Sequence, residues 1–201
     1  MNLLMFPIIV SLISMSPEQK QEGTSKADSS DYHYKIPDYP ESYSPGNVAA
    51  RVVDGLGFRF YWASEGLSQK DLEFRPSEEA SSTAETINHI LNLSTMIVDA
   101  VLSQPNIRQD WSALSVDEKR AITLANIRKA SELLKADHKE MEDYQIIFER
   151  PQGNAVYPFW NILNGPLADA LYHTGQVVSF RRSSGNPIDP NVNVLIGKKR
   201  E

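Results

Sequence analysis

The strongest constraint on the fold is a run of apolar side chains at helical spacing in residues 83–104. One stripe recurs every three or four residues and consists of Ile87, Ile90, Leu91, Ile97, Val98, Val101 and Leu102. Polar side chains gather on the opposite arc of the same segment. A helix with 3.6 residues per turn brings such positions onto one face, so an amphipathic helix is predicted here. Ser82 and Glu85 have the spacing of a capping box, which marks the start of that helix.

Three further segments have helical character. They span residues 47–66, residues 115–143, and a stretch that starts near Pro158 or Pro166 and stops at Gly185. Between the last two, residues 144–156 are expected to form a loop or a short extended passage. No alternating strand pattern separates the helical segments. The chain is therefore predicted to be all-α, with a four-helix bundle over residues 47–184.

The first sixteen residues contain no charged side chain. Residues 3–15 form an apolar run with the length of a signal-peptide core, which is too short for a comfortable membrane span. Ser14 and Ser16 flank an acceptable cleavage site, although no Lys or Arg precedes the apolar run. We predict a signal peptide at residues 1–16, the alternative being a buried or disordered N-terminal segment. Cleavage would give an exported, periplasmic or extracellular protein without a membrane span; without cleavage the protein would be cytoplasmic.

Residues 17–46 and 185–201 differ in composition from the helical region. Residues 17–30 are polar and low in apolar content, which is typical of a linker, and residues 31–46 are rich in Pro and Tyr. Because closely spaced prolines forbid a long helix, an extended arm is predicted there. The C-terminal residues 185–201 are predicted to be an irregular tail.

Charge and cysteine content exclude several functions. The chain has 20 basic and 26 acidic residues and a net charge of −6, which argues against a nucleic-acid partner. It has no cysteine, so disulfides, thiolate metal sites and cysteine nucleophiles are excluded. Any metal site must then use His, Asp or Glu. Two of the four histidines, His33 and His138, lie in polar stretches and are assigned no role.

The other two histidines lie in predicted amphipathic helices. Asp169 and His173 are four residues apart, so they project from one helical face, among apolar neighbours where burial is expected. The simpler interpretation is an Asp–His hydrogen bond inside the bundle. If the second and fourth helices are neighbours, His89 meets this pair across the core. Two imidazoles and one carboxylate would suit Fe, Zn, Ni or Mn and leave coordination positions for a substrate.

At this point the sequence resembles the DinB-like superfamily of predicted metalloenzymes, which are four-helix bundles. Its members carry a histidine in the second helix and a His-x3-His pair in the fourth, often followed by Gly-Gln. The matching text is ETINHILNLS around His89 and DALYHTGQVVSFRR around Asp169 and His173. The run from FRFYWASEG to the second helix also resembles the family's opening. The likeness covers residues 47–184 and departs from the pattern at Asp169, where the family has histidine.

The resemblance implies a divalent-metal site formed by His89, Asp169 and His173. Gln176, one turn after His173, is expected to orient the imidazole or a bound water, and Glu85 is a candidate base or fourth ligand, its alternative role being the capping box. The implied function is a metal-dependent transferase or hydrolase that activates a thiol or water toward a small-molecule substrate. The alternative is a non-catalytic bundle that binds a ligand or metal, or that forms a homodimer.

Two arginines near the end of the fourth helix and two aromatic residues near its start are secondary candidates. Arg181 and Arg182 would bind an anionic substrate or simply stabilise a helix C-terminus, where the dipole favours cations. Tyr157 and Trp160 would line a pocket or belong to the core.

Overall fold

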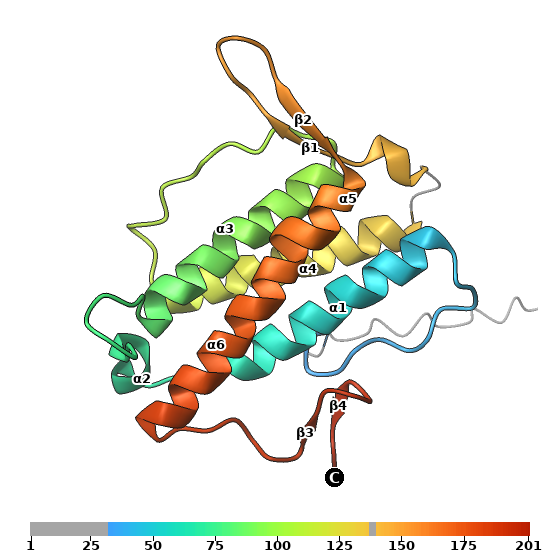
Figure 1. Cartoon of the computed structure of the whole chain (residues 1–201). Helices are drawn as coiled ribbons and strands as arrows, with labels where there is room; N and C mark the ends of the chain where they lie inside the picture. Colours follow the sequence, from blue (N-terminus) through green and yellow to red (C-terminus); the bar gives the residue numbers. More distant parts are fainter. Residues whose placement is uncertain (1–31, 137–139) are drawn as a thin grey trace, which may run out of the picture.

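The structure is a computed structural model that describes residues 32–136 and 140–201 (Figure 1). The predicted signal peptide at residues 1–16, the predicted linker at residues 17–30, and His138 lie outside these residues. The described chain is mostly helical, with two short pairs of antiparallel strands. None of the helices within the described ranges is long and apolar enough to cross a membrane.

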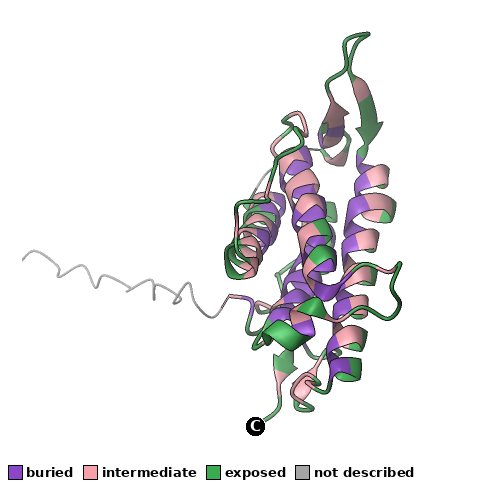
Figure 2. Ribbon diagram, turned by 90° about the vertical axis from the view of Figure 1, so that its left-hand side faces the viewer, coloured by how far each residue is buried: buried purple, intermediate pink, exposed green. Residues whose placement is uncertain are grey.

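Four long helices make up most of the fold. They are α1 (Pro45–Ser64), α3 (Thr83–Val101), α4 (Val116–Ala136) and α6 (Ala168–Ser184). Shorter helical elements connect them: α2 (Gln69–Glu73), the 3₁₀ turn η1 (Met141–Asp143), α5 (Phe159–Ile162) and the π-helical turn η2 (Leu163–Leu167). Both α1 and α3 pack against α4 and against α6. In Figure 2 the buried sides of the long helices face inward.

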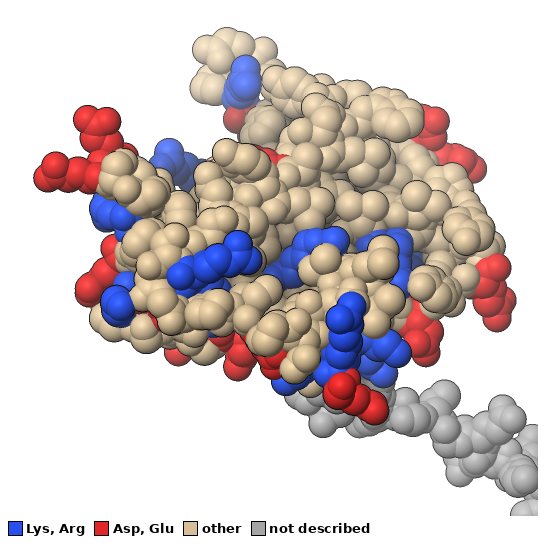
Figure 3. Space-filling model, turned by 60° about the horizontal axis from the view of Figure 1, so that its bottom comes forward, with Lys and Arg blue, Asp and Glu red and all other residues tan. Residues whose placement is uncertain are grey.

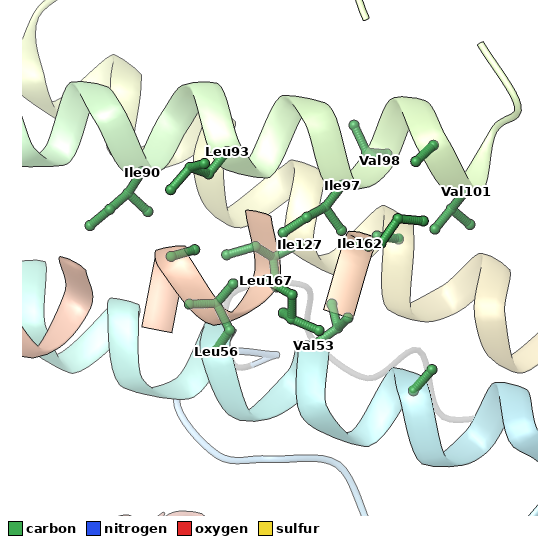
Figure 4. Close-up of a cluster of buried hydrophobic side chains, with 14 of the residues drawn as sticks. Val53, Leu56, Ile90, Leu93, Ile97, Val98, Val101, Ile127, Ile162 and Leu167 are labelled. Atoms are coloured by element: carbon green, nitrogen blue, oxygen red, sulfur yellow. The ribbon is translucent and has the colours of Figure 1, made fainter. Parts of the chain in front are cut away.

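The apolar stripes of these helices form one core. Side chains from α1, α3, α4 and the α5–η2 segment meet in Figure 4, among them Leu56, Ile97, Ile127, Ile162 and Leu167. None of these five side chains is more than 2% exposed. Deleting part of such a side chain leaves a cavity that costs about 2–5 kcal/mol, so this cluster fixes how the helices pack.

The N-terminus of α3 confirms the predicted capping box. The Glu85 backbone amide donates to Ser82 Oγ at 3.2 Å, and the Ser82 amide donates to Glu85 Oε2 at 2.7 Å. Two of the amides that the first helical turn leaves unpaired are satisfied in this way. The helix ends at Val101, slightly earlier than the predicted 83–104.

The fourth predicted helix has a break that explains its two candidate starts. Helix α5 begins after Pro158, and the chain then leaves helical geometry at Gly165 (φ −97°, ψ −109°). Pro166 has no amide proton to donate to the preceding turn, which is a usual cause of a kink. Helix α6 starts immediately beyond this kink, and its first turn contains Asp169.

The arm before α1 is anchored by a buried histidine, which corrects the sequence-based view that His33 has a polar setting and no role. His33 is 8% exposed, and its Nε2 donates to the Leu124 carbonyl of α4 at 2.8 Å. Next to it, the Tyr32 hydroxyl donates to Asp54 Oδ1 at 2.9 Å. A Cβ on Gly57 would lie 2.5 Å from His33 Nδ1, so only glycine leaves room for the ring.

The predicted extended passage and the predicted irregular tail both contain strands. A hairpin pairs β1 (Gln145–Phe148) with β2 (Ala155–Pro158). In the tail, β3 (Val192–Asn193) pairs with β4 (Lys198–Lys199), and the Ile36 amide of the arm donates to the Gly197 carbonyl. On the face seen in Figure 3, basic side chains gather near the middle and acidic side chains lie mostly at the rim.

Candidate metal centre

Three of the predicted site residues come together between α3 and α6. One ligand atom each from His89, Asp169 and His173 lies within 4.8 Å of the others. His89 Nε2 is 3.3 Å from Asp169 Oδ2, and His173 Nε2 is 3.2 Å from Asp169 Oδ1. The two imidazole rings meet edge to face with centroids 4.5 Å apart. Their role as metal ligands stays a prediction.

The spacing of these atoms fits a small divalent cation. Ligand atoms about 2.0–2.2 Å from a tetrahedral zinc lie roughly 3.3 Å from one another. The two nitrogen–oxygen distances, 3.3 and 3.2 Å, are close to that separation. Two imidazoles and a carboxylate are also a common donor set for catalytic zinc and non-haem iron. The residues present therefore fit a metal, even with aspartate at position 169.

The group is open to solvent, which corrects the expectation of a buried pair that His89 meets across the core. The side chains of His89 and Asp169 are 47% and 44% exposed, and that of His173 is 21% exposed. These three side chains therefore lie at the surface, where a small molecule can reach them.

Gln176 fixes the tautomer of His173. Its Oε1 lies 2.6 Å from His173 Nδ1. A carbonyl oxygen can only accept, so Nδ1 carries the proton and donates it. The lone pair on Nε2 then points toward Asp169 Oδ1, and two acceptors at this distance require a proton or a metal ion between them. This contact is of the kind that orients a metal-bound histidine.

Glu85 is occupied by contacts outside this group. Its Oε2 accepts from the Ser82 amide and lies 3.5 Å from Arg75 Nη2. Hydrogen bonds from the backbone and side chain of Ser82 lower the pKa of the Glu85 carboxyl. Among the described residues, the group that could hold a metal does not include Glu85. Its predicted role as a base or fourth ligand stays untested, whereas its capping role is observed.

Arg181 has a structural position rather than a place beside the three candidate ligands. It is buried, and its Nη1 donates to three carbonyls at the end of α1, those of Trp62, Ala63 and Glu65, at 2.9–3.0 Å. Its guanidinium therefore closes the C-terminus of a neighbouring helix. Arg182 is exposed on the last turn of α6.

The contact of Tyr172 with this group was missed by sequence reasoning, which left open whether Trp160 lines a pocket or belongs to the core. Tyr172 is 65% exposed and packs its ring edge to face on His173 at 5.3 Å. Trp160 is 74% exposed and lines a hollow beside α1, so it belongs neither to the core nor to this group. The Tyr172 contact had a signal in the sequence, since the two residues are adjacent, but adjacent residues on a helix usually diverge.

Comparison with known proteins gives a likeness of fold. No family model matches the chain, and no curated protein matches it. Among solved structures, the chain is similar to the crystal structure of a DinB family member from Shewanella denitrificans. The match covers 78% of this chain and 91% of that chain, at 12% sequence identity and a TM-score of 0.48. This is the family that the sequence motifs resemble, and at such identity the likeness concerns the backbone alone.

Proposed function

We propose that this protein is a DinB-like, divalent-metal-dependent enzyme whose metal is held by His89, Asp169 and His173. In this proposal the four long helices form a bundle of DinB-like type. The observation that carries it is the contact of Gln176 with His173 Nδ1, which leaves Nε2 facing a carboxylate oxygen at 3.2 Å. A proton or a divalent cation between these acceptors relieves their repulsion, and the second imidazole, His89, beside the same carboxylate favours the divalent cation.

The reaction class follows from the donor set and its exposure. A divalent metal in such a site lowers the pKa of a bound water or thiol and so supplies a nucleophile near neutral pH. Gln176 holds the His173 ring in the ligating tautomer, and the exposed side of the three-residue group admits a small-molecule substrate. The metal would be Zn, Ni, Fe or Mn. If the chain is exported, hydrolysis is favoured over thiol transfer, because low-molecular-weight thiols are scarce outside the cytoplasm.

A second candidate function is binding without turnover. The observation that favours it is the engagement of Glu85 by Ser82 and Arg75, which removes one predicted base from the metal site. In that case the chain would bind a metal or small ligand, or form a homodimer.

We retain export after cleavage at residue 16 and the lack of a nucleic-acid partner as parts of the proposal.

Metal analysis of the full chain, prepared without a chelating tag, separates the two candidates from a metal-free scaffold. We expect one divalent ion per chain in the wild type and its loss in His89→Ala and His173→Ala. Arg182→Ala is a matched control, because it changes an exposed α6 residue outside the group. Hydrolysis of 4-nitrophenyl acetate that follows the metal content supports the enzyme, whereas bound metal without turnover supports the binding module.

A further inference from the structure

A large cavity of the described chain runs along the outer face of α3. It has a volume of about 770 Å³ and lies between α3 and the connector that leads to α4. In Figure 1 this connector runs beside α3 on the side away from α6. Its position is fixed by Trp111, whose Nε1 donates to Asn92 Oδ1 at 2.9 Å. The cavity therefore has a defined wall on each side.

None of the three candidate metal ligands lines the cavity, but His89 shares a face of α3 with some of the residues that do. Glu85, Asn92 and Met96 line it, and they are four residues before, three after and seven after His89. Residues at these intervals share one helical face. A molecule that contacts a metal held by His89 can thus extend along α3 into the cavity without leaving the surface.

The lining combines an apolar wall with amide groups. Ile107, Trp111 and Phe148 supply the apolar side, opposite the α3 residues Asn88 and Asn92. The Asn92 amide is already held by Trp111 and by the Asn88 carbonyl. Within the described ranges no protein group bonds the Asn88 side-chain amide, which can both donate and accept.

Two basic and two acidic side chains line the cavity. They are Arg108 and Lys119, and Asp110 and Glu85. Hydrogen bonds from Ser112 lower the pKa of the Asp110 carboxyl, and the two basic side chains add to this effect. A cavity with balanced charge gives no net attraction to an anion or a cation.

We propose that this cavity binds the substrate of the metal centre and that the substrate is an uncharged amide or ester with an aromatic or branched apolar group. The carbonyl at the scissile bond reaches the metal side of His89, the apolar group packs against Trp111 and Ile107, and Asn88 bonds a neighbouring carbonyl or amide. This inference rests on the proposed function and adds to it a substrate class and a binding surface.

Hydroxamic acids test the cavity separately from the metal, because the hydroxamate binds the metal and the tail probes the cavity. Isothermal titration of the zinc-loaded full chain compares acetohydroxamic acid with 3-phenylpropionohydroxamic acid. We expect the phenyl tail to improve affinity by about tenfold or more through burial of its apolar surface. Analogues with a carboxylate or an ammonium on the ring are expected to bind more weakly than the neutral probe.

Two variants and one control test whether the phenyl tail of the probe lies in the cavity. Ile107→Ala and Asn88→Leu each change a cavity residue that is in contact with solvent rather than in the core. Each is expected to reduce the gain in affinity that the phenyl tail gives, while acetohydroxamic acid binds as before. Val156→Ala, at a half-exposed β2 residue outside the cavity, should change neither affinity.

The outcomes separate the two proposals. A loaded protein that binds both probes equally, or that prefers a charged tail, overturns the cavity assignment and leaves the metal centre intact. A gain in affinity from the phenyl tail that persists in both cavity variants also overturns the cavity assignment. A chain that retains no zinc, or zinc that binds neither hydroxamate, overturns the proposed enzyme and the cavity assignment with it.

Discussion

The buried His33 makes the stability of this protein depend on pH between about 4 and 6.5. Burial lowers the pKa of His33 from 6.5 to about 4. The bond to the Leu124 carbonyl and the charge of Asp54 act in the opposite direction, and two arginines assist the burial effect. Because Nε2 donates to Leu124, protonation would place a second N–H at Nδ1, against Gly57. The folded state therefore resists protonation.

The sign and size of the pH effect on the free energy of unfolding follow from this lowered pKa of His33. Between the two pKa values the unfolded chain binds more protons than the folded one, so the free energy of unfolding rises with pH in that window. The contribution is complete above pH 6.5 and is lost as the pH falls toward 4. One pKa unit corresponds to about 1.4 kcal/mol, so the whole loss is about 3 kcal/mol, with about 2 kcal/mol of it gone at pH 5.

Urea denaturation at pH 7 and pH 5 measures this contribution. His33→Gln is the matched variant, since its side-chain amide can donate to the Leu124 carbonyl but does not titrate. We expect the wild type to lose about 2 kcal/mol more than the variant on this change in pH. Equal losses in the two proteins would refute the buried, neutral state of His33.

Three other predictions follow from particular contacts. Gly57→Ala should destabilise the protein by about 1–3 kcal/mol in thermal denaturation, because its Cβ would lie 2.5 Å from the His33 ring. The control Gly175→Ala, with no atom within 4 Å of its Cβ, should be neutral or stabilising. Equal changes in stability for the two variants would contradict the close approach of His33 to Gly57. Arg181→Gln should lower the free energy of unfolding in urea by about 2–4 kcal/mol, because three carbonyls at the end of α1 lose a charged donor. Arg182→Gln should change it by no more than about 0.5 kcal/mol. Equal losses in the two variants would argue against capping of α1 by Arg181. Gln176→Leu should weaken zinc binding about 10–100-fold in a competitive chelator titration, and unchanged affinity would show that the His173 tautomer is set elsewhere.

Local patterns explain what the sequence predicts correctly. The capping box of Ser82 and Glu85 and the apolar stripe around Ile90 depend only on neighbours within a few helical turns. The start of α3 can therefore be predicted from the sequence. The i,i+4 relation of Asp169 and His173 is local as well. The predicted helical content agrees with the structure for the same reason.

Contacts between distant segments explain what the sequence does not predict. The burial of His33 depends on Gly57 and Leu124, which no nearby residue signals. The exposure of Asp169 depends on the kink at Gly165 and on how α6 then meets α3. The role of Arg181 requires the end of α1 to lie beside it. In each case the deciding partner is set by packing rather than by local periodicity.

The central claim is that His89, Asp169 and His173 together hold a divalent ion. Anomalous diffraction at the zinc edge, from crystals of the full chain grown with zinc, tests it most directly. We expect one strong peak about 2.0–2.2 Å from a nitrogen of each imidazole and an oxygen of Asp169, and no such peak in crystals of Asp169→Ala. A zinc-soaked crystal in which the three side chains only bond to one another, without a peak between them, would contradict it.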